Sequence, residues 1–384
     1  MLFLVAAKCL FVVVLVVGVC VPLLAWVDRK QSALMQDRIG GNRAAIGGVT
    51  LIGLFHPLAD FVKLLTKEDV VPAGANRVLH ALAPIIAVVP AIAALAVIPY
   101  GGVYTFGRST VSLVAADIDW GVLYIFALGS IATYGAVLAG WSSNNNWSLL
   151  GGVRAAAQMI SYEVTMGLSI VGIFMVFGTL KLTDMAAAQD STIRIMGFVE
   201  VFGWILPEWA SRFPFTLPNW GIVLQPLGFV MFLTCSMARN KRPPFDLPEA
   251  GSELVAGYLT EYSGMRYGLF RLAELVEIAV IAGLMTSLFL GGWTVPWLST
   301  DRIIGAIAPL LGEAFANVVC LLAQVAMFIA KVVGMIWLQM LIRWSLPRFR
   351  YDQLMNLCWK VLLPLSIANI FATAGVLLLL GEVG

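Results

Sequence analysis

Long apolar stretches alternate with short polar segments along most of the chain. Eight of these stretches have about the 20 apolar residues that a helix needs to cross the hydrocarbon core of a bilayer. They lie at residues 2–26, 79–101, 119–140, 156–180, 220–238, 268–291, 314–342 and 357–381. Because a helix satisfies its own backbone hydrogen bonds in lipid, the pattern predicts an all-α polytopic membrane protein with about eight transmembrane helices.

Residues 50–66 show a different pattern, in which apolar side chains recur at helical spacing between polar ones. These side chains are Leu51, Leu54, Phe55, Leu58, Phe61, Val62 and Leu65. The segment is too short and too polar to span a bilayer. We therefore expect an amphipathic helix that lies at the membrane interface.

Composition supports membrane insertion. The chain is 60% hydrophobic and 12% charged, with a mean hydropathy of +0.91, whereas soluble domains are about one quarter charged. The first apolar run is longer than the core of a signal peptide, so we expect it to remain as a span. The 5 cysteines are widely spaced and the 2 histidines lie away from span centres. With no dinucleotide, Walker A or iron–sulfur spacing, we expect no cofactor or metal bound by this chain.

The distribution of Lys and Arg predicts the orientation. Fourteen of these residues fall on the side reached after the first, third, fifth and seventh spans, and five fall on the other side. Basic loops stay in the cytoplasm, so we expect both termini to lie outside. The outer loop 181–219 is long, and Phe198, Val201, Phe202 and Ile205 indicate a surface helix within it.

One cytoplasmic loop, residues 239–267, is both charged and suited to packing. Its first part, 239–262, reads RNKRPPFDLPEAGSELVAGYLTEY, with four acids and three bases around a proline-rich turn. Inside the predicted spans lie Glu163, Glu274, Glu277 and Lys331. Because charge in hydrocarbon costs several kcal/mol, such residues are usually functional.

These residues also allow structural interpretations. Lys331 could form an ion pair with Glu274 or Glu277, and Glu163 could be a buried acid hydrogen-bonded to Gln158 or Tyr162. Arg154 could pair with an acid, and Asp60 with Lys63 could be an exposed helix pair. Taken together, however, the acids at the cytoplasmic ends of the spans are typical of a proton relay. With no nucleotide or redox site of its own, the chain would receive energy from a partner or a bound small molecule.

Several long motifs resemble the H subunit of bacterial NADH:quinone oxidoreductase, or respiratory complex I, which is the counterpart of subunit one of mitochondrial complex I. They are residues 57–64 (PLADFVKL), 140–144 (GWSSN), 154–163 (RAAAQMISYE), 242–250 (RPPFDLPEA), 253–258 (ELVAGY), 260–265 (TEYSGM) and 346–355 (LPRFRYDQLM). The resemblance covers nearly the whole chain. It implies a subunit of the bacterial inner membrane that forms part of a quinone chamber and couples quinone reduction to proton translocation.

The resemblance also assigns residues and partners. The quinone-chamber candidates are Arg29, Arg38, Phe245, Asp246, Glu249 and Glu253. The proton-path candidates are Asp60, Glu163, Glu249, Glu253, Glu261 and Glu274. Quinone would be the substrate, and NADH, FMN and iron–sulfur clusters would bind to partner subunits. The other expected partners are antiporter-like and peripheral-arm subunits and membrane lipids, but no nucleic acid.

Departures from the family pattern concern the charged residues. Asp28 stands where the family has a glutamate before Arg29, and Gly251 stands where the family commonly has an acid between Glu249 and Glu253. The loop therefore lacks one carboxylate that a three-acid relay would use.

Two other functions compete with this interpretation. A homologous membrane subunit of an energy-converting hydrogenase, or of a related ferredoxin-linked complex, would share many of the motifs. A secondary transporter would use Glu163 and Lys331 as its ion site, but the sequence shows no matching broken helices in two halves.

Overall fold

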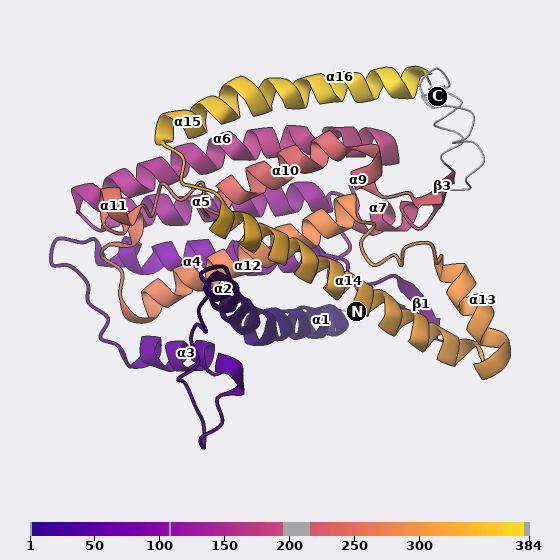
Figure 1. The fold of residues 1–384 in the computed structure, drawn as a ribbon, viewed down its shortest axis with the longest axis horizontal. Coiled ribbons are helices and arrows are strands. Elements are labelled where there is room, and N and C mark those ends of the chain that lie inside the picture. Colours follow the sequence, from indigo (N-terminus) through magenta and orange to yellow (C-terminus); the bar gives the residue numbers. More distant parts are fainter. Residues whose placement is uncertain (1, 107–108, 195–215, 380–384) are drawn as a thin grey trace.

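The computed structural model describes residues 2–106, 109–194 and 216–379, and most of them are helical (Figure 1). Seven helices in these ranges are long and apolar enough to cross a membrane. They are Lys8–Met35, Arg77–Val97, Gly121–Ser142, Asn146–Phe177, Gly264–Phe289, Phe315–Ser345 and Tyr351–Leu379. The predicted all-α polytopic class is therefore confirmed.

The chain begins with one long helix that bends and then leads to a small separate helix. Helix α1 (Leu2–Leu15) continues through η1 (Val16–Cys20) into α2 (Val21–Met35), past the predicted end at residue 26. After η2 (Leu51–Gly53), α3 (His56–Thr66) forms within the segment predicted to be amphipathic. No residue of α3 is buried in this chain. Its apolar face is therefore free to contact lipid or another subunit.

The next helices form the densest part of the bundle. They are α4 (Arg77–Ala94) with η3 (Leu95–Val97), α5 (Gly121–Ser142) and α6 (Asn146–Phe177). A hairpin of β1 (Val103–Phe106) and β2 (Ser109–Ser112) joins α4 to α5. Helix α6 starts earlier than the predicted residue 156 because Asn145 caps it, its side-chain oxygen accepting from the Trp147 N–H at 2.9 Å.

The predicted outer loop contains short ordered elements. These are α7 (Leu182–Ala188), β3 (Thr192–Arg194) and β4 (Thr216–Pro218), and the two strands pair antiparallel with Ile193 opposite Leu217. The predicted surface helix with Phe198, Val201, Phe202 and Ile205 lies outside the described residues.

The fifth predicted span, 220–238, is interrupted. Helix α9 (Gly221–Leu224) ends at Gln225, and α10 (Pro226–Arg239) begins after it. Proline disfavours helical geometry in the residue before it, and Gln225 is accordingly non-helical. With 14 residues, α10 is about 21 Å long, which is shorter than a bilayer core of about 30 Å.

The rest of the chain supplies the central helix and the outer helices. The elements are α11 (Gly251–Leu254), η5 (Gly257–Leu259), α12 (Gly264–Phe289), α13 (Thr300–Leu311), α14 (Glu313–Ser345), α15 (Tyr351–Asn356), η6 (Leu357–Leu362) and α16 (Leu363–Leu379). Helix α12 is the most buried of the seven long apolar helices and packs against α4 and α14. Helices α14 and α16 lie at the periphery of the bundle (Figure 1).

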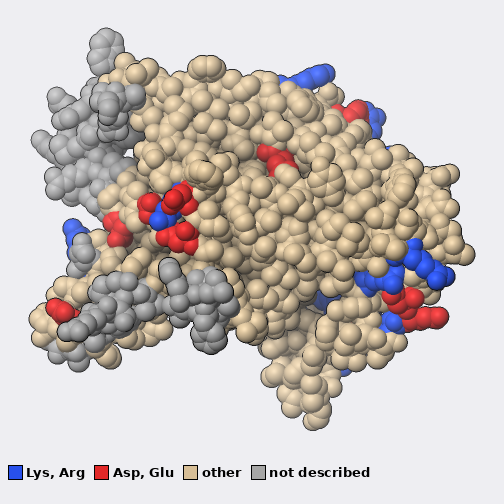
Figure 2. Space-filling model, turned by 180° about the vertical axis from the view of Figure 1, so that it is seen from behind, with Lys and Arg blue, Asp and Glu red and all other residues tan. Residues whose placement is uncertain are grey.

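The two ends of the bundle differ. Helix α1 begins and α16 ends toward the end that holds β1 and β3, whereas α3 and α11 lie at the opposite end (Figure 1). Figure 2 shows charged side chains mainly toward the two ends of the visible face and sparsely between them. An apolar girdle between two polar ends is the arrangement that a bilayer requires.

Candidate functional site

The charged segment 239–262 is folded into the end of the bundle. Arg242 is 4% exposed and Phe245 is 3% exposed. Gln158 of α6 holds this part of the segment, because its side-chain N–H group donates to the carbonyl oxygens of Ala238 at 2.6 Å and Phe245 at 2.7 Å. A segment with this many charges is therefore fixed against α6 as part of the protein interior.

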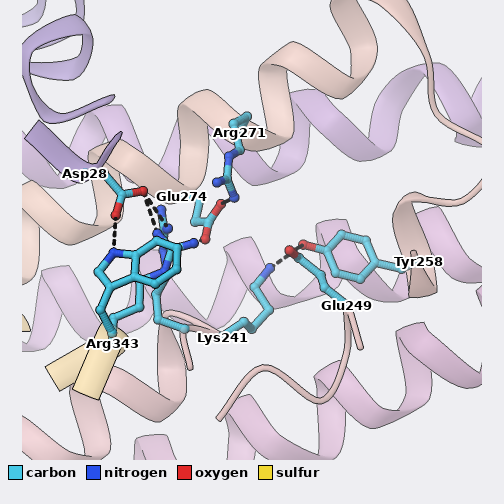
Figure 3. A network of polar contacts seen from close by, with 9 residues as sticks. Asp28, Lys241, Glu249, Tyr258, Arg271, Glu274 and Arg343 are labelled. Carbon is cyan, nitrogen blue, oxygen red and sulfur yellow. Dashed lines mark hydrogen bonds and ion pairs between the residues drawn. The ribbon is translucent and has the colours of Figure 1, made fainter. Parts of the chain in front are cut away.

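A buried cluster of five charged residues joins this segment to three helices (Figure 3). Arg242 in the segment contacts Glu274 of α12 at 2.6 Å, and Arg271 of α12 pairs with the same carboxylate. Asp28 of α2 pairs with Arg343 of α14 at 2.6 Å and lies 3.7 Å from Arg242. The cluster therefore connects α2, the charged segment, α12 and α14.

Burial governs the energetics of this cluster. Burial lowers the pKa of the Arg242 guanidinium, while the Glu274 carboxylate acts in the opposite direction. An arginine nevertheless stays protonated in proteins, so its charge depends on these carboxylates for compensation. Removing one partner of a buried ion pair costs about 3–5 kcal/mol. The cluster thus fixes where the segment sits relative to the helices.

A second polar group lies beside the cluster and contains Glu249. The Tyr258 hydroxyl donates to the Glu249 carboxylate at 2.9 Å, and the Lys241 ammonium donates to the Tyr258 hydroxyl at 2.6 Å (Figure 3). Burial raises the pKa of Glu249, the nearby Glu274 carboxylate raises it further, and Lys241 opposes both effects. Burial likewise raises the pKa of Tyr258 well above its ordinary value. Glu249 is therefore a carboxyl group that holds a proton more readily than an exposed one.

Two further acids of the segment have individual partners on α6 and its cap. Glu253 pairs with Arg154 at 2.6 Å, so the pairing expected for Arg154 is present. Glu261 accepts from the side-chain amide of Asn145 at 2.7 Å. A Cβ atom added at Gly251 would meet no atom within 4 Å, so this position has room for a side chain.

Asp246 and Phe245 lie where the segment meets the C-terminal part of the chain. Asp246 pairs with Arg348 at 2.9 Å, and burial raises its pKa while Arg348 lowers it. The Phe245 ring packs between Tyr162 and Phe349, with ring centroids 5.8 and 5.5 Å away. Phe245 therefore belongs to the packed core of this chain.

Glu163 of α6 has a different environment from the one its neighbours in sequence indicate. Gln158 donates to backbone carbonyls, and the Tyr162 hydroxyl donates to the Leu354 carbonyl oxygen at 2.8 Å. The alternative interpretation of Glu163 as an acid hydrogen-bonded to Gln158 or Tyr162 is therefore not supported. Both side chains point to backbone acceptors, and Glu163 lies 3.8 Å from the guanidinium of Arg239.

The candidates near α3 are only partly brought together. Asp60 pairs with Arg29 of α2 and lies 3.7 Å from Lys63, so the expected Asp60–Lys63 pair is present. Arg38 is exposed, and its guanidinium bonds to the Gln36 side chain at 2.7 Å. Asp60 thus joins α3 to α2, while Arg38 stands apart from the buried cluster.

Lys331 does not form the ion pair with Glu274 or Glu277 that one interpretation of the sequence allowed. Its ammonium donates to three backbone carbonyl oxygens after the end of α12: Leu290 at 2.6 Å, Gly292 at 3.1 Å and Thr294 at 2.6 Å. Carbonyl groups at a helix C-terminus lack partners and attract cations. Lys331 therefore fixes the turn that follows α12, and its three donors are engaged by backbone carbonyl groups.

Some residues of the buried groups were not predicted from the sequence. Arg271 lies three residues before Glu274 on one helix, so its spacing was a usable signal. Arg343 had no such signal, because α14 meets the segment only in the folded chain. Tyr258 lies within the segment, but its contact with Glu249, nine residues earlier, matches no helical spacing. Asp28 stood out only as a departure from the family pattern, yet it is the second acid of the cluster.

Fold and site together define a multi-pass membrane protein that carries buried acids and bases at one end of its helical bundle. Residues 7–374 match the family model described as NADH dehydrogenase. The chain is 42% identical over 354 residues to the H subunit 1 of NADH-quinone oxidoreductase of Cytophaga hutchinsonii, covering 92% of this chain and 91% of the relative. It is 44% identical over 357 residues to the H subunit 1 of NADH-quinone oxidoreductase of Geobacter metallireducens, and the match covers 93% of this chain and 91% of the relative. It is 39% identical over 383 residues to the H subunit of NADH-quinone oxidoreductase of Bdellovibrio bacteriovorus, and the match covers 96% of this chain and 94% of the relative. The chain therefore belongs to the family of H subunits of NADH-quinone oxidoreductase.

Proposed function

We propose that this chain is the membrane subunit of a proton-pumping NADH-quinone oxidoreductase in the bacterial inner membrane. It helps to form the quinone chamber and couples quinone reduction to proton translocation. NADH, FMN and iron–sulfur clusters bind to partner subunits, which deliver the electrons. The observation that carries the proposal is the charged segment 239–262, which is folded into the bundle so that Glu249 lies beside the buried cluster that contains Glu274.

The chemistry of quinone fits such a group. Reduction to quinol takes up two electrons and two protons, and groups beside the quinone must supply or pass on those protons. Glu249 has a raised pKa and bonds to Tyr258, so it can exchange a proton with a neighbour. Any change in charge at Glu249 acts on Glu274 and its arginines, because charges interact strongly in a buried site. Protons then continue through Glu163 inside the bundle.

Two surfaces of this chain support the proposed partners. The end of the bundle that holds α11 faces the cytoplasm and the peripheral arm, and Glu253 and Glu261 lie there. Helix α3 exposes Leu58, Phe61 and Leu65, a surface suited to lipid and to quinone arriving from the bilayer. The named relatives favour the quinone enzyme over a hydrogenase-type complex.

Glu249→Gln in the assembled complex tests the proposal. In membranes, NADH:quinone reductase activity should fall about tenfold or more, as expected when an acid–base group is lost. Electron transfer from NADH to an artificial acceptor that bypasses quinone should remain, which shows that the complex has assembled. The exposed Glu68→Gln is the matched control. Full quinone reductase activity and full proton pumping in Glu249→Gln would overturn the proposal.

A further inference from the structure

Arg239 occupies an unusual place at the inner end of the charged segment. It is the last residue of α10, and it is only 6% exposed. Its guanidinium lies directly on Gly129 of α5, where an added Cβ atom would overlap the Nη2 and Cζ atoms. A Cβ atom and the guanidinium cannot occupy the same space. The guanidinium can therefore pack against α5 at this position because residue 129 is glycine.

Two carboxylates from two other helices face this guanidinium. Glu163 of α6 lies 3.8 Å from Arg239 Nη1 and has no hydrogen bond to its Oε1 atom among the described residues. Glu277 of α12 lines one small cavity together with Arg239 and Gly129, and this cavity has a volume of about 20 Å³. Apart from Arg239 and Glu277, the residues that line this cavity are apolar or glycine, and its volume has room for about one water molecule.

The charges at this place are unequal. The Arg239 guanidinium is the positive charge beside two carboxylates, those of Glu163 and Glu277. The other charged groups that act on Glu277 are Lys241 and Glu274. A buried carboxylate is costly without a compensating charge. The compensation of these two buried carboxylates therefore depends on where the Arg239 guanidinium lies.

We propose that Arg239, seated on Gly129, is a positioning residue of the proton path that holds Glu163 and Glu277 as one group around a fixed positive charge. This inference rests on the proposed function, because it assumes that protons pass through Glu163. Arg239 takes up no proton itself, since a guanidinium stays charged. Instead it sets the pH range in which the two acids exchange protons.

Arg239→Gln removes the charge and tests this role. An opposite charge within about 4–6 Å favours the ionised carboxylate and shifts its titration by about 1–3 pH units. Without Arg239, the midpoint of the pH profile of coupled quinone reductase activity should move upward by about one pH unit or more. Arg239→Lys retains the charge and should restore the midpoint toward the wild-type value. The readout uses membranes with the assembled complex, normalised to electron transfer to the artificial acceptor.

Gly129→Ala provides a second test that keeps every charge. The added methyl group displaces the guanidinium, so the midpoint should move in the same direction as in Arg239→Gln. Gly167→Ala on α6 is the matched control, because a Cβ atom there meets nothing within 4 Å. If Arg239→Gln does not accumulate in the membrane, the profile of Gly129→Ala decides the question.

The outcomes separate this inference from the proposed function. If Glu163→Gln lowers proton pumping but Arg239→Gln and Gly129→Ala keep the wild-type midpoint, the proposed role of Arg239 is overturned. The proposed proton path through Glu163 then still stands. If Glu163→Gln leaves pumping unchanged, the proposed path fails first. Adding Arg239→Gln to Glu163→Gln should shift the midpoint less than Arg239→Gln shifts it in the wild type, because only Glu277 then remains to lose its compensating charge. Equal shifts would contradict the coupling of Arg239 with Glu163.

Discussion

Glu274→Gln is the substitution that examines the buried ion cluster most directly. It removes the carboxylate that Arg242 contacts at 2.6 Å and that Arg271 also contacts. At this distance and an effective dielectric constant of about 20, one such pair attracts by about 6 kcal/mol. Part of that attraction offsets the cost of burying the charges, so the expected net loss is about 3–5 kcal/mol.

Most of this loss should come from Arg242. The Arg271 side chain is 37% exposed and can turn toward water, whereas the Arg242 side chain is 5% exposed and remains among buried atoms. Removing the stranded charge should therefore restore stability. The double variant Glu274→Gln/Arg242→Gln should recover more than half of the loss, a coupling that a double-mutant cycle measures.

Thermal inactivation of quinone reductase in membranes, together with the amount of subunit retained, measures the effect. Glu274→Gln should inactivate at a lower temperature than the wild type, and Glu313→Gln, an exposed acid on α14, should not. The reasoning is refuted if Glu274→Gln is as stable as the wild type, or if adding Arg242→Gln makes it worse. A stable double variant with wild-type pumping would also show that Glu274 is an anchor and not a proton carrier.

Three further predictions concern single positions. Gly251→Glu should assemble normally, since a side chain there meets open space, and it should change the pH profile of quinone reduction; an identical profile would count against an acid being useful there. Lys331→Met should destabilise the subunit, because it removes three hydrogen bonds from a charged group, each of which contributes about 1.5–3 kcal/mol. It should leave the protons pumped per electron unchanged, and a lower ratio would instead place Lys331 in the path. Because the folded-state pKa of Glu249 is raised, its contribution to stability is present at low pH and is lost as the pH rises through that pKa. Thermal stability should fall less with rising pH in Glu249→Gln than in the wild type, and parallel curves would contradict this.

The apolar pattern predicted the fold well where hydrophobic length alone decides it. The fifth span shows the limit, because the run 220–238 is continuous in hydropathy while Pro226 interrupts the helix at Gln225. The Gln225 side chain fixes this break against α16, because it donates to the Thr373 hydroxyl at 2.8 Å and accepts from the Asn369 amide at 2.9 Å. Those partners lie about 150 residues away in sequence, at a distance that periodicity cannot reveal.

The candidate site was predictable as a set of acids but not as a set of pairs. The position of each acid followed from its own helix or motif. Two acids have a cation three residues away on the same helix, in the pairs Asp60–Lys63 and Arg271–Glu274. Others have a cation on another element, as with Glu163 and Arg239 or Glu253 and Arg154. The sequence offers many possible partners for each acid, and tertiary packing selects among them. Lys331 illustrates the error that results, because backbone carbonyls at a helix end are acceptors that a search for acidic side chains overlooks.

The pairing also distinguishes among the acids of the charged segment. Asp246 and Glu253 each pair directly with an arginine, a partner that keeps its charge at any physiological pH. Glu249 instead bonds to the hydroxyl of Tyr258, which in turn accepts from Lys241. A carboxyl group held by a neutral hydroxyl can gain or lose a proton without breaking a direct ion pair. The loop therefore contains two acids that are paired with arginines, Asp246 and Glu253, and two that are bonded to neutral donors, Glu249 and Glu261. Of the latter two, Glu249 is the one whose pKa burial raises.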